Sequence, residues 1–176
     1  MTTQARLSTP VDHPRSTPLD AAQVYQEGMV AGILGALTIA LWFLLLDTVA
    51  GRPLWTPTVL GTALFRNGAG LGTPETLPVS LEMVLMFTWV HGLVFVVLGG
   101  IAARLLSHVE RHPGSGFGVL LFFVVFQFGF IVAAVVGAAP VLHALTPWSI
   151  LVANLLAAAI MTAYFRQRHP HLRVSP

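Results

Sequence analysis

One histidine lies inside an apolar stretch of the chain, where an ionisable side chain is costly and is therefore a functional candidate. This residue, His91, falls near the middle of the apolar segment 81–106. Its neutral imidazole could ligate the metal of a haem or chlorin, or pass a proton. No second histidine lies inside an apolar segment, so a five-coordinate haem or pigment is the form that a single ligand allows.

Two polar side chains, Gln127 and Asn154, fall at a depth comparable to that of His91 in their own apolar segments. These three residues are the candidate cofactor-binding or proton-handling set, with His91 at its centre. The alternative is structural, since a neutral His91 can hydrogen-bond to Thr88, to a backbone carbonyl or to either amide within a seam between helices.

Charged residues gather at the outer ends of the predicted helices. Asp47, Arg52, Glu82 and His143 would lie near one surface, where they could form a charge cluster or a metal site. The spacing of these residues does not match a metal-binding motif, and we predict no metal site. We expect instead a structural ion pair between Asp47 and Arg52 that locks the turn after the first span.

The sequence carries no pattern of a catalytic site. It has no phosphate-binding glycine loop, no G-x-S-x-G elbow and no pair of carboxylates within an apolar segment. His108 and His112 are four residues apart but lack a third ligand, so a solvated pair explains them. Because cysteine is absent, disulfides and thiolate metal sites are excluded. We therefore predict no catalytic residues and no enzyme activity, and the sequence requires no cofactor.

The composition is typical of a membrane protein, with 55% hydrophobic and 9% charged residues. Four apolar segments, each about long enough to cross a hydrocarbon core of about 30 Å, cover residues 28–50, 81–106, 117–139 and 148–165. We predict an all-α fold, an integral membrane four-helix bundle over residues 28–166. A partly disordered cytoplasmic arm, residues 1–27, precedes the bundle, and a cytoplasmic tail, residues 167–176, follows it.

A short amphipathic helix is predicted between the first two spans. Thr56 can cap a helix whose first turn begins at Pro57, and Asn67 with Gly68 ends it. Its apolar side chains share one face that excludes Thr58 and Thr62. This apolar face consists of Val59, Leu60, Ala63 and Leu64. Such a helix lies flat in the headgroup region or packs over the mouth of the bundle.

The sequence also predicts where the helices begin and end, and which small residues lie between them. Pro18 begins a juxtamembrane helix that continues into the first span, Gly51 helps to end that span, and Ser80 caps the second. Close approach of membrane helices relies on small residues. The predicted stripes are Gly28, Gly32, Gly35 and Ala36 on the first span and Thr88, Gly92, Gly99 and Ala103 on the second.

Arginine sets the expected orientation, because positively charged residues accumulate on the cytoplasmic side. Seven arginines fall in the arm, the turn after the second span and the tail, whereas only Arg52 and Arg66 fall on the other side. Both termini are therefore predicted to be cytoplasmic.

Short motifs around the first two spans resemble those of small four-span bacterial inner-membrane proteins that are uncharacterised in function. The motifs are Asp47, Gly51-Arg52-Pro53, Thr56-Pro57, Leu60-Gly61, Leu64-Phe65 and His91-Gly92. The resemblance implies the bacterial inner membrane, and it brings no catalytic or binding residue with it.

These observations predict a non-catalytic integral membrane protein, an accessory, structural or assembly subunit of a larger respiratory or photosynthetic complex. Its partners would be the lipid bilayer and other membrane subunits or a second copy, with no role for nucleic acid. The alternative is a haem- or chlorin-binding or proton- or ion-handling protein centred on His91.

Overall fold

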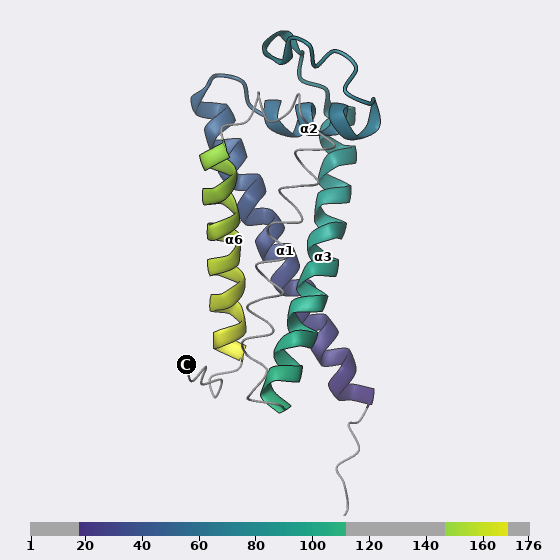
Figure 1. Cartoon of the computed structure of the whole chain (residues 1–176), viewed down its shortest axis with the longest axis vertical. Coiled ribbons are helices and arrows are strands. Elements are labelled where there is room, and N and C mark those ends of the chain that lie inside the picture. The colour runs from purple at the N-terminus through teal and green to yellow at the C-terminus, as the bar shows by residue number, and fades with distance from the viewer. Residues whose placement is uncertain (1–17, 112–146, 169–176) are drawn as a thin grey trace, which may run out of the picture.

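The computed structural model describes residues 18–111 and 147–168 of the 176-residue chain. The regular elements in these ranges are all helices: α1 (Pro18–Val49), α2 (Trp55–Phe65), the 3-10 turn η1 (Pro74–Thr76), α3 (Leu81–Arg111) and α6 (Pro147–Arg168). The long helices α1, α3 and α6 run along the length of the molecule, and α2 lies across one end (Figure 1).

In the described residues, three helices are long and apolar enough to cross a membrane: Ala22–Val49, Leu81–His108 and Trp148–Arg168. They confirm the all-α fold of the described residues and three of the four predicted spans. α1 runs toward the end that α2 covers, whereas α3 and α6 both run away from it (Figure 1). These directions are those expected if a further span lies between α3 and α6. That predicted span, residues 117–139, lies outside the described residues.

Among the described helices, α1 is the one that packs against both other long helices. Near the end covered by α2, the indole N–H of Trp42 donates to the carbonyl of Ser149 on α6 at 3.1 Å. Farther along, a Cβ atom added at Gly35 would lie 2.8 Å from the Sδ atom of Met161 on α6. The α1–α6 interface therefore combines polar contact with close apolar packing.

Backbone meets backbone where α1 crosses α3. A Cβ atom added at Gly28 would lie 2.7 Å from the Cα atom of Gly100, and one added at Gly99 would lie 2.6 Å from the nitrogen of Gly32. Real Cβ atoms do not approach so closely, so only glycine permits this crossing. The predicted small-residue stripes are confirmed at these positions. Two members of the α3 stripe do not lie in this contact: a Cβ atom at Gly92 meets nothing within 4 Å, and Thr88 is exposed.

Local sequence explains where the helices end. After α1, Gly51 has a φ of 73°, and the N–H groups of Gly51 and Arg52 donate to the carbonyls of Thr48 and Asp47. This is the glycine-dependent pattern that closes many helices. At the start of α3, the hydroxyl of Ser80 accepts the N–H of Met83 at 3.4 Å, which confirms the predicted cap.

α2 confirms the predicted short helix and the packing of Val59 against the bundle, but the prediction placed Thr58 and Thr62 off the buried face, which is wrong. The side facing the bundle carries Thr58, Val59 and Thr62, whereas Leu64 is 53% exposed. The two threonines can be buried because each hydroxyl donates to a carbonyl one turn back, at 2.8 Å. Their small size and Gly61 bring α2 against Met83, where a Cβ atom on Gly61 would lie 2.5 Å from the carbonyl oxygen.

Small side chains fill the contacts between the long helices, and large apolar ones point outward. The buried apolar residues of these helices are mostly alanines: Ala31, Ala36, Ala103, Ala153 and Ala157. Leucine, isoleucine, valine and tryptophan side chains are exposed along all three helices. An apolar exterior over a small-residue interior is the arrangement expected in lipid, where helices gain little from the hydrophobic effect against one another.

Gly99 and its neighbour Gly100 provide a matched test of the α1–α3 crossing. Gly99→Ala places a methyl group against the backbone of α1, so we expect a loss of about 1–3 kcal/mol in unfolding free energy. Gly100→Ala meets nothing within 4 Å and gains helix propensity, so its stability should be unchanged or higher. Unfolding in detergent micelles measures both variants, and equal stabilities would contradict the crossing.

Candidate functional site

His91 lies at the seam between α3 and α1. Its Nε2 atom is 3.4 Å from the carbonyl oxygen of Ala36 on α1, within hydrogen-bonding range. The ring is half-buried and lies between two phenylalanines of its own helix, with centroid distances of 5.6 Å to Phe87 and 4.8 Å to Phe95. The imidazole thus contacts a backbone carbonyl and two aromatic rings, as a histidine that stabilises helix packing would.

The structure does not join His91 to Asn154, the other described candidate of the polar layer. Asn154 is half-buried on α6, and no hydrogen bond links it to His91. The interhelical hydrogen bond of His91 goes instead to α1. Gln127, the third candidate, lies outside the described residues.

A buried carboxylate, Asp47, connects the end of α1 to the start of α2. Its carboxylate is buried and accepts two hydrogen bonds of 2.7 Å from Thr56, one from the backbone N–H and one from the hydroxyl. Thr56 is in the first turn of α2, where backbone N–H groups lack helical acceptors and the helix dipole favours negative charge. Asp47 on α1 therefore caps α2 from a different helix.

This cap corrects two expectations. The Asp47–Arg52 ion pair does not form: Thr56 donates to both oxygens of the Asp47 carboxylate, and the Arg52 guanidinium lies over the Trp55 ring. Arg52 contacts Asp47 only through its backbone N–H, which donates to the Asp47 carbonyl at 2.8 Å. Thr56 is not the cap residue of α2, since the helix begins at Trp55 and Leu54 occupies the cap position without a side-chain bond.

Arg52 and Trp55 connect the start of α2 to the loop between α2 and α3. The Arg52 guanidinium lies 4.4 Å from the centre of the Trp55 ring and donates to the carbonyl of Glu75 at 3.3 Å. The buried indole of Trp55 donates to the carbonyl of Pro74 at 3.0 Å. Together with Val59 and Leu71, Trp55 forms a small apolar core under the loop. Asp47, Arg52, Trp55 and Thr56 thus have a structural role and are called here the α2 cap.

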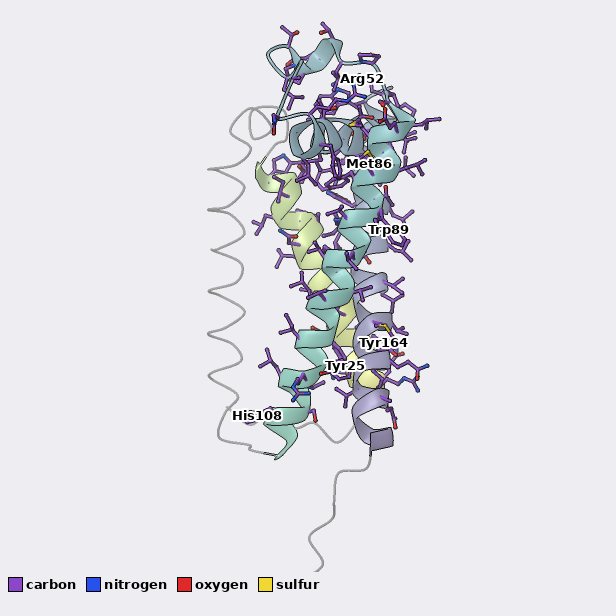
Figure 2. All side chains as sticks on the ribbon, turned by 90° about the vertical axis from the view of Figure 1, so that its right-hand side faces the viewer. Tyr25, Arg52, Met86, Trp89, His108 and Tyr164 are labelled. Atoms are coloured by element: carbon purple, nitrogen blue, oxygen red, sulfur yellow. The ribbon has the colours of Figure 1, made fainter. Side chains whose placement is uncertain are left out.

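The described residues contain no group of three potential metal-binding side chains. Both Asp47 oxygens are engaged by Thr56, and Glu82 pairs with Arg66 at 3.0 Å on the exposed surface. His143 and His112 lie outside the described residues. His108 is exposed near the end of α3, at the opposite end of the molecule from Arg52 (Figure 2).

The sequence analysis missed a buried acid, Glu27, on α1. Its side chain is 7% exposed and accepts a hydrogen bond of 3.3 Å from the amide of Gln23. The candidate span that contains it begins at Ala22, whereas the predicted span begins at residue 28. The helical spacing is a signal that could have found it. Glu27 lies one helical turn before Ala31 and therefore shares its face, and Ala31 is fully buried.

No protein-family model, curated protein or solved structure matches this chain significantly. The fold itself defines the class. Three long apolar helices pack together with small residues between them and large apolar side chains outside. The chain is a multi-pass helical membrane protein.

The α2 cap can be tested with the same substitution, threonine to valine, at two positions. Thr56→Val removes the hydroxyl that donates to Asp47, so we expect a loss of about 1–3 kcal/mol in the stability of α2 against local opening. Thr48→Val removes a hydroxyl that donates to the carbonyl of Leu44 on an exposed face, and it should change stability by less than about 0.5 kcal/mol. Hydrogen exchange of the α2 amides measures both, and similar rates in the two variants would contradict the cap.

Proposed function

We propose that this protein is a non-catalytic accessory, structural or assembly subunit of a larger membrane complex in the bacterial inner membrane. The observation that carries this proposal is an exposed apolar ridge on α3. The ridge consists of Leu81, Leu85, Trp89 and Leu93, and each side chain is more than half exposed. A spacing of four residues keeps these side chains in a single row along the helix.

Trp89 indicates that protein, as well as lipid, covers this ridge. Its side chain is 75% exposed and lies along the shaft of α3, away from both ends of the helix (Figure 2). It is about 12 Å along the helix axis from Leu81, well inside the length that the span needs to cross hydrocarbon. Hydrocarbon offers no acceptor for an indole N–H, and tryptophan usually finds one. A helix of a neighbouring subunit can supply a carbonyl or hydroxyl there.

The contacts of His91 agree better with this role than with cofactor binding. Its Nε2 atom, one of the two ring nitrogens that could ligate a metal, is directed at the Ala36 carbonyl. The ring is held between Phe87 and Phe95, which leaves it as part of the α1–α3 seam. We therefore propose a packing role for His91.

The distribution of arginine supports cytoplasmic termini. Arg104, Arg166 and Arg168 lie toward the end where α1 begins and where α3 and α6 finish. Arg52 and Arg66 lie at the other end, next to α2. Under the positive-inside rule the first end faces the cytoplasm. α2 would then face the opposite side of the membrane.

Purification from the native membrane in mild detergent tests the subunit role. We expect other membrane chains to co-purify, and Trp89→Phe should weaken their retention about fivefold, because one interhelical hydrogen bond contributes about 1 kcal/mol. Trp148→Phe is the matched control, since this exposed tryptophan lies at the first turn of α6, where water and headgroups can accept its N–H. A protein that purifies alone would contradict the proposal, as would equal losses in both variants.

The visible spectrum of the same sample tests the role of His91. We expect no absorption band that depends on this residue, and His91→Ala should only lower stability, since it removes the contact with Ala36. A band that disappears in His91→Ala would favour the alternative function, a haem- or chlorin-binding protein centred on α3. His108→Ala, at the exposed end of the same helix, is the control.

A further inference from the structure

A tyrosine and an arginine from different helices meet at the end of the bundle where α1 begins. An Nη1–H group of Arg104 on α3 donates to the hydroxyl of Tyr25 on α1 at 3.1 Å. Both side chains are exposed, and Tyr25 lies near this end of the molecule (Figure 2). The hydroxyl orients the guanidinium over the α1–α3 seam and occupies one of its five N–H donors.

The charge of Arg104 is not compensated by this contact. Arg66, at the other end, forms an ion pair with Glu82 at 3.0 Å. Arg52 lies on the ring of Trp55 and donates to a backbone carbonyl. Within the described residues, Arg104 instead bonds to a neutral hydroxyl and to no carboxylate, so its positive charge is not paired there. A planar guanidinium with paired N–H donors fits the oxygens of a phosphate group.

Apolar surface continues from this charged position toward the membrane interior. On α3, Ile101 and Val97 lie one and two turns before Arg104 and are 40% and 54% exposed. On α1, Met29 lies one turn after Tyr25 and is 44% exposed. A phosphate-binding group followed by an exposed apolar strip is complementary to a phospholipid, which has an anionic headgroup joined to acyl chains.

We propose that the Tyr25–Arg104 pair binds the phosphate of an anionic phospholipid, with an acyl chain along Val97, Ile101 and Met29. Arg166 and Arg168 at the same end add to the positive potential that attracts anionic headgroups. This site begins one turn beyond Leu93, the last residue of the exposed ridge, and it does not rest on the proposed subunit role. The ligand class is a lipid with net negative charge, such as phosphatidylglycerol.

Native mass spectrometry of the delipidated, full-length protein tests this site with phosphatidylglycerol as the probe. We expect Arg104→Gln to weaken binding about fivefold, the effect of one arginine near an anionic headgroup. Arg66→Gln removes a charge that Glu82 already pairs and should leave binding unchanged. Phosphatidylcholine, whose choline offsets the phosphate charge, should bind more weakly than phosphatidylglycerol to the unmodified protein.

Two further measurements separate a lipid site from a phosphate site and from a folding defect. Glycerol phosphate, which lacks acyl chains, should not displace phosphatidylglycerol at equal concentration, and displacement would overturn the proposal in favour of a free phosphate ligand. Tyr25→Phe keeps the ring and should lower phosphatidylglycerol binding by a smaller factor than Arg104→Gln. The proposal is also overturned if Arg104→Gln and Arg66→Gln bind the lipid equally, or if phosphatidylcholine binds as tightly.

Discussion

The contact between the backbones of α1 and α3 at Gly28, Gly32 and Gly99 is the constraint on which the rest of the structure depends. It sets the distance between the two helices, and α1 also packs against α6. Because the helices approach so closely, the ring of His91 reaches the Ala36 carbonyl and Arg104 reaches Tyr25. The seam and the proposed lipid site are both consequences of a crossing that only small residues allow.

The two ends of this bundle use polar side chains differently. At the end covered by α2, polar groups satisfy one another: Asp47 caps α2 through Thr56, Trp55 and Arg52 bond to the loop, and Arg66 pairs with Glu82. At the opposite end, Arg104 and Arg168 each donate to a tyrosine hydroxyl, which carries no charge. One end is therefore a closed structural cap, and the other is suited to anionic headgroups.

The sequence predicted the features that depend on local pattern. Apolar length predicted the three described spans, glycine spacing predicted the Gly28–Gly32–Gly99 seam, and Ser80 was correctly read as a cap. It failed where a polar side chain finds its hydrogen-bond partner inside the protein and not in water. The pattern for α2 assumed that threonines face water, whereas Thr58 and Thr62 satisfy their hydroxyls within the helix and are buried. Likewise, Arg52 is the charge nearest to Asp47 in sequence, but folding brings Thr56 to its carboxylate.

Solid-state NMR of the protein in lipid bilayers, with ¹³C-labelled glycine, measures the α1–α3 crossing most directly. The structure places the backbone of Gly28 against Gly99, so we predict a through-space cross-peak between the Gly28 carbonyl carbon and the Gly99 Cα carbon. If this cross-peak is missing while cross-peaks between the neighbours Gly99 and Gly100 are observed, the two helices do not meet at these glycines. The backbone contact between α1 and α3 would then be contradicted.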